Sequence, residues 1–463
     1  MAEINNNPAV IWGTRRISWS QLDQYCVTVI GHLKGLGIRP GERVAICAPT
    51  STEYIIVLFA AWRMKVIVAP VNHKWPAKTI TDYLSRINAS LLLTTHAIKS
   101  QIPHLVTRTL FLNEVVGFDA RKDARVVGES FNPDPSQEVT IIATSGSSGE
   151  AKPVLHTWGN HLFNAKGSQD IIPIKSSDRW ALSLPLFHVS GMAIVVRTFL
   201  NGAAMAIPTE EALEETILKR QVTHISLVST QLFRLFQTQE GIDALKSLKF
   251  ILLGGSVIPA GLLEQAKALG LNVFMSYGLT ETASQVATGK VGGCVKVLPY
   301  RELKISDEGE VLIKGPVLFK GYIQAGRIQL PLTEDGYFKT GDLGQLDKDG
   351  CLKVLGRKDN MFISGGENIQ PEEIEAVLLK LKGVERVIVT SKEDAEFGRR
   401  PVAFIKFIDD EDIAHDQIIQ HCKQHLTSFK IPVAFHPWPQ NLMEKGLKVS
   451  RKEFSSFLRP YGA

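Results

Sequence analysis

The sequence predicts an α/β protein in which helices cover mainly parallel sheets in a large N-terminal domain, followed by a small α+β domain. The chain has 463 residues, which is too long for one ordinary hydrophobic core. Strand-like and helix-like patterns alternate through most of it, as in proteins with parallel sheets. From about Tyr300 onward, short strands separated by Gly and Asp turns indicate antiparallel β structure.

The N-terminal pattern predicts these elements in order. Apolar periodicity indicates a helix over 20–36, with Ser18 as its N-cap two residues earlier, and further helices over 53–63 and 262–269. Short apolar runs that are typical of buried strands occupy 43–48, 66–70, 91–94, 140–143, 180–184 and 250–253.

A new pattern begins after Gly356. Helices are predicted over 370–381 and 413–426, and strands over 384–390 and 402–408. We place a boundary at 357–360. It divides the chain into a domain of residues 1–356 and a domain of residues 361–463, and the second has a normal domain size.

The composition is that of a soluble globular protein, with 44% hydrophobic and 21% charged residues. A net charge of +5 is too dilute to indicate nucleic-acid binding, and it mildly favours small anions such as nucleotides. The five cysteines are scattered without a C-x-x-C pair, so we expect free thiols in a reducing compartment.

Neither export nor a membrane span is predicted. The first residues, Met1 to Trp12, lack the pattern of a secretory signal. The most apolar long stretch, 54–71, contains Arg63 and Lys65, whose charges would be costly inside a bilayer. A buried helix followed by a strand is the better interpretation, and we expect a cytoplasmic protein.

A run rich in Gly and hydroxyl residues directly follows the strand predicted over 140–143. Such residues let the backbone approach phosphate oxygens and donate hydrogen bonds to them, while a lysine adds charge. The spacing does not fit a Walker motif, because Gly149 is followed by Glu150, and a flexible surface loop is the alternative. The candidate phosphate-binding residues are Thr144, Ser145, Gly146, Ser147, Ser148, Gly149 and Lys152.

A second motif, Tyr277-Gly278-Leu279-Thr280-Glu281, follows Gly254-Gly255-Ser256. The ring can stack on a base, the threonine can hold a phosphate, and the glutamate can bind Mg²⁺. A β-turn with a solvated glutamate is the alternative.

A third motif ends in Asp342 and is followed by Gly356-Arg357-Lys358-Asp359. An aspartate can accept hydrogen bonds from both ribose hydroxyls, and a nearby arginine can share the sugar. Two hairpin turns with ordinary charges are the alternative.

Together and in this order, the three motifs resemble the adenylate-forming superfamily of acyl-CoA and aryl-CoA ligases, peptide-synthetase adenylation domains and luciferases. The resemblance covers nearly the whole chain, and it includes L-P-L-F-H-V at His188 and G-R-K-D-N-M-F-I-S-G-G-E-N-I-Q-P-E-E-I-E from Gly356. It implies an N-terminal AMP-binding domain with a small β-barrel-like part, a hinge at 357–360 and a small mobile C-terminal lid domain.

The resemblance also implies roles for single residues. The segment 254–256 and Tyr277 should surround the adenine, and Asp342 and Arg357 should hold the ribose. The remaining roles are the α-phosphate contact (Thr280), the Mg²⁺ ligand (Glu281), the carboxylate site (His188), the hinge (Asp359) and the loop that faces the thiol (Ser364, Gly365 and Gly366).

The catalytic lysine of the superfamily usually stands in a Gly-Lys-[Ile/Val/Leu]-x-Arg setting near the C-terminus. Here the pattern Lys-Val-x-Arg selects Lys448, with Leu447 where glycine is common. Lys445 is the competing choice, but nothing that follows it fits. His421, Cys422 and His425 have a metal-like spacing on a predicted helix; no other ligands complete a site, so a solvated helix face is preferred.

The implied activity is that of an ATP-dependent acid–thiol ligase, which forms an acyl-adenylate and then a thioester of coenzyme A. A stand-alone adenylation domain that loads a carrier protein is one alternative. A non-catalytic nucleotide-binding relative is another, disfavoured because the positions of Lys448, Glu281 and Asp342 are all occupied. We expect a small carboxylic acid, ATP, Mg²⁺ and coenzyme A as ligands and no nucleic acid, and we leave a homo-oligomer open.

Within the superfamily, the resemblance is closest to the o-succinylbenzoate–CoA ligases of menaquinone biosynthesis, in segments 186–191, 362–373 and 446–451. Arg197 stands in an apolar run just after His188 and would need an anionic partner, because isolated charge is costly to bury. A second substrate carboxylate would supply one, with Ser229 adding a hydrogen bond. Alternatively, Arg197 pairs with a structural acid or reaches solvent, and the substrate is an aryl or medium-chain acid.

Overall fold

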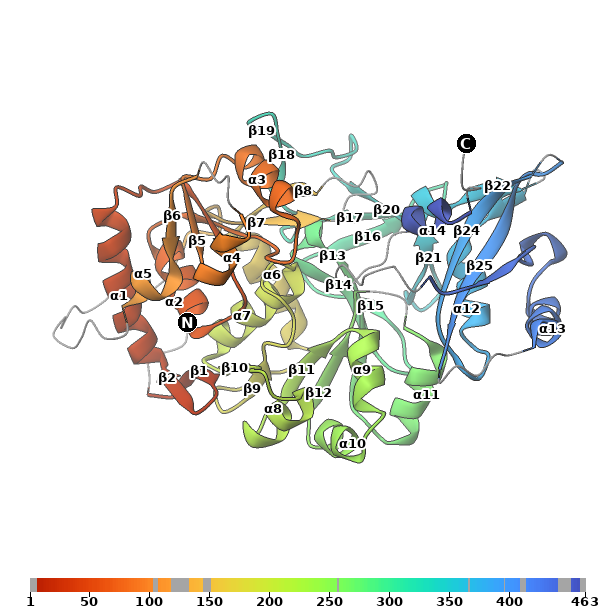
Figure 1. Cartoon of the computed structure of the whole chain (residues 1–463), viewed down its shortest axis with the longest axis horizontal. Coiled ribbons are helices and arrows are strands. Elements are labelled where there is room, and N and C mark those ends of the chain that lie inside the picture. Colours follow the sequence, from red (N-terminus) through yellow and green to blue (C-terminus); the bar gives the residue numbers. More distant parts are fainter. Residues whose placement is uncertain are drawn as a thin grey trace.

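The computed structural model describes residues 6–102, 107–117, 133–144, 151–255, 258–364, 367–394, 396–408, 414–439 and 451–458. Figure 1 shows the N-terminal half of the chain at one end of the molecule and the C-terminal part, in blue, at the other.

One large sheet is formed by strands from the first half of the chain and a later hairpin. Its order is β19 (Arg327–Gln329), β18 (Gly321–Gln324), β8 (Lys152–Thr157), β7 (Glu138–Thr144), β4 (Ile67–Pro70), β3 (Arg43–Cys47), β5 (Leu91–Thr94) and β6 (Thr109–Phe111). The pairs from β7 through β6 are parallel, and β8, β18 and β19 extend the sheet in antiparallel pairing. β4 and β5 are buried along their whole length, as expected for a parallel sheet with both faces covered.

A second large sheet is built in the same way. Its order is β15 (Lys296–Val297), β14 (Ser284–Lys290), β13 (Val273–Leu279), β12 (Phe250–Leu253), β11 (His224–Leu227), β9 (Arg179–Ala181), β10 (Ala204–Ile207), β1 (Pro8–Trp12) and β2 (Arg15–Ser18). The pairs from β13 through β1 are parallel, and the outer strands at both edges are antiparallel.

Helices cover the two sheets. They are α1 (Trp19–Gly35), α2 (Thr52–Arg63), α3 (Ala77–Arg86), α4 (His96–Ser100), α5 (Leu112–Val116), α6 (Trp158–Gln169), α7 (Val189–Asn201), α8 (Leu213–Lys219), α9 (Ser229–Leu235), α10 (Gln239–Lys246) and α11 (Ala260–Ala268). One apolar cluster joins α1, α2, α6 and α7 to strands of both sheets. The stretch 54–71 is a buried helix followed by a strand, as predicted, and no helix in the described part of the chain is long and apolar enough to cross a bilayer.

The antiparallel part predicted after Tyr300 is a third sheet in the order β16 (Glu302–Ile305), β17 (Glu310–Lys314), β20 (Phe338–Leu346) and β21 (Leu352–Arg357). Its short turns contain the predicted glycines, and Gly309, Gly336 and Gly350 have positive φ angles, which glycine adopts at little cost.

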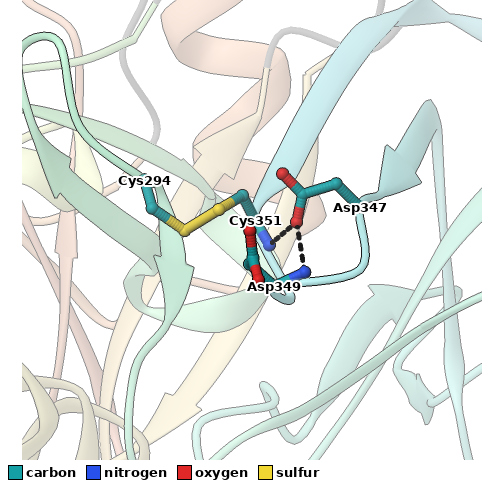
Figure 2. The surroundings of a disulfide bond; sticks show 4 residues. All are labelled: Cys294, Asp347, Asp349 and Cys351. Carbon is teal, nitrogen blue, oxygen red and sulfur yellow. Dashed lines mark hydrogen bonds between the residues drawn. A yellow bond between two sulfur atoms is a disulfide. The ribbon is translucent and has the colours of Figure 1, made fainter.

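A disulfide joins this third sheet to the second one. It links Cys294, in the turn between β14 and β15, to Cys351, just before β21. Figure 2 shows it beside Asp347, whose carboxylate accepts the backbone N–H groups of Asp349 and Cys351 at 2.9 Å each. The expectation of five free thiols is therefore wrong for this pair, because residues 57 positions apart are brought together by the fold; Cys26, Cys47 and Cys422 are free and buried.

The last part of the chain forms small sheets of its own. β22 (Phe362–Ser364) pairs with β23 (Glu367–Ile369), and β24 (Val384–Asp394), β25 (Gly398–Phe407) and β26 (Phe435–Pro437) form a further sheet. Helices α12 (Pro371–Leu378), α13 (His415–His425) and α14 (Arg451–Ser456) accompany them. Residues of these elements other than α14 share an apolar cluster separate from the N-terminal ones, as expected of a small α+β unit.

Candidate functional site

The segment Thr280–Glu281 lies in a short 3₁₀ turn, η1 (Thr280–Thr282), at the end of β13. Each carbonyl of this turn accepts a hydrogen bond from a different part of the fold. His156 Nε2 donates to Thr280 O at 2.7 Å, the Phe319 N–H donates to Glu281 O at 2.8 Å, and Asn164 Nδ2 donates to Thr282 O at 2.9 Å. The turn is thus fixed in position by β8, by the segment before β18 and by α6.

His156 is fully buried in β8, and burial lowers its pKa to about 4. The ring is therefore neutral at pH 7, and because a carbonyl can only accept, the proton lies on the Nε2 that faces Thr280. A neutral ring anchors the turn without adding positive charge beside Glu281.

The carboxylate of Glu281 is half-buried, and its Oε1 accepts a hydrogen bond from the hydroxyl of Tyr322 on β18 at 2.7 Å. Burial and the charge of Glu281 raise the pKa of Tyr322, so its hydroxyl stays a donor. Lys152 Nζ lies 5.6 Å from the centre of the Tyr322 ring. A single fixed carboxylate of this kind suits Mg²⁺, which is commonly held by one or two carboxylates together with phosphate oxygens.

The predicted ribose residues are in direct contact. Arg357 Nη1 donates to Asp342 Oδ1 at 3.1 Å, and the Tyr277 hydroxyl donates to Asp342 Oδ2 at 2.6 Å. The side chains come from neighbouring strands, since Asp342 of β20 pairs with Arg357 of β21. Gly341 has φ +72°, and a Cβ there would lie 2.7 Å from Arg357 Nη2, so glycine leaves room for the arginine.

The glycine of the second motif also has a steric reason. A Cβ on Gly278 would lie 2.0 Å from the carbonyl oxygen of Ser284 on the neighbouring β14. Gly254 and Gly255 follow β12, and Tyr277 lies in the adjacent parallel strand β13, so these segments emerge side by side. The structure thus brings Gly254, Gly255, Tyr277, Thr280 and Glu281 to the carboxyl ends of two neighbouring strands, where α/β proteins bind ligands.

The first motif connects two antiparallel strands. Thr144 ends β7 and pairs directly with Lys152, which begins β8. Several predicted residues lie outside the described part of the chain, namely Ser145, Gly146, Ser147, Ser148, Gly149, Ser256, Gly365, Gly366 and Lys448.

Comparison with known proteins decides the family. The family model described as AMP-binding enzyme matches residues 2–323, and that of the AMP-binding enzyme C-terminal domain matches residues 373–445. The chain belongs to the AMP-binding enzymes.

Among curated AMP-binding enzymes, the 2-succinylbenzoate--CoA ligase of Bacillus licheniformis is 33% identical over 448 residues, which cover 92% of each chain. The o-succinylbenzoate CoA synthetase (MenE) from Bacillus subtilis in complex with the acyl-adenylate intermediate OSB-AMP superposes with a TM-score of 0.86 at 29% identity, covering 97% of this chain and 95% of that one. The same enzyme in complex with ATP and magnesium ion gives a TM-score of 0.81 at 29% identity, covering 93% of each chain.

In this AMP-binding enzyme, two of the predicted acyl-site residues, His188 and Arg197, lie at the start of and within α7, and the third, Ser229, lies in α9. His188 is the N-terminal cap residue of α7 and is half-buried, with its ring 4.7 Å from that of Phe187. Ser229 is buried at the start of α9.

Arg197 lies in the interior of α7, and only 2% of it is exposed. Its Nη2 donates to Gln285 Oε1 and to Asn164 Oδ1 (3.4 Å), and its guanidinium lies 5.6 Å from the centre of the Trp180 ring. These partners are neutral, and no described Asp or Glu forms an ion pair with Arg197. The alternatives in which Arg197 reaches solvent or pairs with a structural acid therefore do not hold within the described residues.

The segment between the N-terminal and C-terminal parts contains η2 (Lys358–Asn360), where Asp359 is exposed and its Oδ2 accepts from Arg357 Nη2 at 3.3 Å. Ser364 is buried at the end of β22. Cys422 is buried in the C-terminal core, and among the described residues no group of three or more His, Cys, Asp or Glu could hold a metal ion.

Sequence reasoning missed the residues that support the motifs. His156, Tyr322, Asn164 and Gln285 hold motif residues, yet each is a single polar residue in an otherwise ordinary helix or strand. A single polar residue in a helix or strand is a weak signal, and it does not identify the partner.

Proposed function

We propose that this AMP-binding enzyme is a 2-succinylbenzoate–CoA ligase, which converts o-succinylbenzoate, ATP and coenzyme A into o-succinylbenzoyl-CoA, AMP and pyrophosphate in menaquinone biosynthesis. The observation that supports the substrate assignment is a fully buried arginine, Arg197, whose partners among the described residues are all neutral. It is bonded through Asn164 to the turn that carries Thr280 and Glu281. The relatives named 2-succinylbenzoate--CoA ligase support the same choice. We place the reaction in the cytoplasm.

In the first half-reaction, the aliphatic carboxylate of the acid attacks the α-phosphorus of ATP, and pyrophosphate leaves. Negative charge grows on the phosphoryl oxygens, so fixed donors there stabilise the transition state. The Thr280 hydroxyl and the Lys448 ammonium serve this role in the proposal. Tyr277, Asp342 and Arg357 hold the nucleoside, and the residues from Thr144 to Lys152 contact the phosphates.

Glu281 is the residue that would hold Mg²⁺, whose charge would neutralise part of the phosphate charge. Its carboxylate is oriented by Tyr322, and its backbone is fixed by Phe319, so the ligand is in place before the nucleotide binds.

In the second half-reaction, the sulfur of coenzyme A attacks the acyl carbon, and AMP leaves with the bonding electron pair. The loop of Ser364, Gly365 and Gly366 faces the thiol in this proposal. The two half-reactions need different residues of the C-terminal unit, so residues 361–463 act as a lid that turns relative to residues 1–356 about the hinge at 357–360.

The substrate has two carboxylates, of which one is activated and the ring carboxylate remains free to approach Arg197. Ser229 adds a hydrogen bond to the same acyl site, and His188 lies near the carboxylate to be activated. A simple fatty or benzoic acid would leave the buried arginine without an anion and should be a poor substrate.

The deciding experiment measures ATP-dependent pyrophosphate release with o-succinylbenzoate, benzoate, a cinnamate-type acid and octanoate, with and without coenzyme A. We expect a clear preference for o-succinylbenzoate and release of free acyl-CoA. A preference for octanoate or benzoate would overturn the substrate assignment. Adenylation without acyl-CoA release would point to a carrier protein as acceptor, and absence of AMP formation would overturn the enzymatic function.

The variant Arg197→Ala tests the role of this arginine in binding the acid. It should lower kcat/KM for o-succinylbenzoate by roughly 10-fold or more, because a buried ionic contact to the substrate is lost. Unchanged KM and kcat would overturn the role of Arg197 and leave the overall function intact.

A further inference from the structure

A second buried arginine lies next to Arg197. Arg301 precedes β16, only 7% of it is exposed, and its Nε donates to the carbonyl oxygen of Gln285 at 3.2 Å. Its Nη1 donates to Pro299 O at 2.6 Å, whereas its Nη2 is buried without a partner. Gly167 on α6 leaves the room, since a Cβ there would lie 2.5 Å from Arg301 Nη1.

Both guanidinium groups are bound to one residue. Gln285 accepts from Arg197 with its side chain and from Arg301 with its backbone carbonyl, and its own amide donates to Thr288 Oγ1 at 2.7 Å. Asn164 completes the group, because its Nδ2 donates to Gln285 O at 2.9 Å and its Oδ1 faces Arg197. All these partners are neutral.

The arrangement leaves two positive charges without compensation. Within the described residues, neither arginine has an Asp or Glu partner, and Arg197 Nε and Arg301 Nη2 are buried donors without acceptors. Burial lowers the pKa of Arg197 to about 10; burial, followed by the charge of Arg197, lowers that of Arg301 to about 9, so both stay charged at pH 7. Two buried cations that repel one another are costly unless an anion joins them.

The same group is connected to the nucleotide site. Gln285 is the cross-strand partner of Gly278, and Asn164 also donates to Thr282 O in the turn that carries Thr280 and Glu281. An anion bound by the arginines would therefore be linked, through Asn164 and Gln285, to the turn that carries Thr280 and Glu281.

We propose that Arg301 is a further specificity-determining residue of the acyl site: with Arg197 it forms a two-guanidinium site on Gln285 that selects acids with a second carboxylate. This inference rests on the proposed function and adds a residue that no sequence motif marks. Arg301 acts by its charge and by fixing Gln285, which orients Arg197.

The test compares two acids that differ only in the second carboxylate. o-Succinylbenzoate carries it on the ring, and 4-oxo-4-phenylbutanoate has the same keto acid chain and ring without it. Pyrophosphate release is measured with both acids in the parent, in Arg301→Met and Arg301→Gln, which remove the charge, and in Arg301→Lys, which keeps it. Arg43→Met is the control, because Arg43 is partly buried, donates to the backbone carbonyl of Ile87, and lies in β3 of the other large sheet.

We expect the neutral variants to lower kcat/KM for o-succinylbenzoate by about 10-fold, mainly through KM, and to change that for 4-oxo-4-phenylbutanoate by less than about 2-fold. Arg301→Lys should keep most of the preference, and Arg43→Met should keep all of it. Arg301→Gln retains a donor for Gln285 O, so it reports on the charge even if Arg301→Met does not fold.

Equal losses for both acids would show a purely structural role and overturn the inference. An unchanged ratio of the two kcat/KM values would also overturn it. So would an Arg301→Lys variant that behaves like Arg301→Met. If the parent itself does not prefer o-succinylbenzoate, the proposed function fails. If the parent prefers it and the neutral variants keep that preference, only the role of Arg301 fails.

Discussion

Single buried side chains position the backbone on which the nucleotide motifs depend. His156 shows this most clearly: it is neutral because it is buried, and its Nε2 fixes the carbonyl of Thr280. Tyr322 does the same for the side chain of Glu281. The charged and hydroxyl groups expected to meet ATP are thus held before ATP binds, which lowers the cost of reorganisation during reaction.

Lys448 is predicted to serve adenylation alone. Lys448→Ala should lower the rate of acyl-adenylate formation by about 10²-fold or more, because one donor to the developing phosphoryl charge is lost. Thioester formation from supplied acyl-adenylate and coenzyme A should survive. Rapid-quench measurement of each half-reaction checks this.

Lys445→Ala is the matched control for this assignment. If it reproduces the selective loss, or if Lys448→Ala slows both half-reactions equally, the choice of Lys448 is wrong.

Among the elements, β21 and α12 are joined by hydrogen bonds beside the proposed hinge at 357–360. Gln370 Nε2 donates to Arg357 O at 3.1 Å, and Asn360 Nδ2 donates to Glu372 Oε1 at 2.6 Å. Glu372 in turn pairs with Arg451 at 3.1 Å, at the start of α14. Rotation about the proposed hinge would break the contact between Gln370 and Arg357, whereas Glu372 and Arg451 both belong to the lid and would move together.

Asp359→Pro should hold the protein in one closed state. Proline fixes φ and restricts the preceding residue, here Lys358 in η2. We expect at most one half-reaction to proceed at the parent rate, measured with ATP and acid for the first and with acyl-adenylate and coenzyme A for the second. An Asp359→Pro protein that completes the overall reaction at the parent rate would contradict the hinge assignment.

The disulfide between Cys294 and Cys351 joins the turn between β14 and β15 to the hairpin between β20 and β21 (Figure 2). A cross-link over 57 residues stabilises the folded state by roughly 4 kcal/mol at most, because it lowers the entropy of the unfolded chain. Such a bond would be unusual in a reducing compartment. A reducing agent should therefore lower the Tm of the oxidised parent and leave that of the Cys294→Ser, Cys351→Ser double variant unchanged.

Thiol titration of the denatured, unreduced parent gives an independent check. Three reactive thiols, those of Cys26, Cys47 and Cys422, are expected. Five would show that the bond does not form under the conditions of purification.

For the whole molecule, the titration of Glu375, a buried carboxyl in the described part of the C-terminal unit, affects stability. Burial raises the pKa of Glu375 to about 7, against the opposing effects of Arg451 and the Val389 N–H, from an ordinary value of 4.5. Between these values the folded state binds more protons than the unfolded state, so this group's stabilisation is fully present below about pH 4.5 and is lost as pH rises through about 7.

The prediction concerns the difference between the parent and Glu375→Gln, which does not titrate. The free energy of unfolding of the parent relative to this variant should decrease from pH 5 to pH 8, as measured by urea unfolding of the C-terminal unit. Glu396→Gln, at an exposed position, is the control and should show no such trend. A difference that is constant with pH would contradict the prediction.

How well the sequence predicts a feature depends on how far apart along the chain the interacting residues lie. The strands over 91–94 and 250–253 were predicted with their observed bounds, and Ser18 caps α1 as expected, because periodicity and capping involve neighbouring residues. The strand over 180–184 is shorter, since β9 ends at Ala181 and Ser183 instead donates to Ser226 O. The order of the motifs was enough to indicate the family, whereas the residues that meet the nucleotide and the domain boundary stay predictions.

By itself, the sequence determined the alternation of strands and helices, the motifs and their order, and thereby the family to which the chain belongs. Only the tertiary structure decided that Cys294 and Cys351 are paired, that His156 fixes Thr280 from 124 residues away, and that Arg197 and Arg301 share Gln285. The physical reason is that a local pattern is set by adjacent side chains, whereas hydrogen-bond satisfaction and the cost of buried charge depend on which distant groups the fold places within a few ångströms.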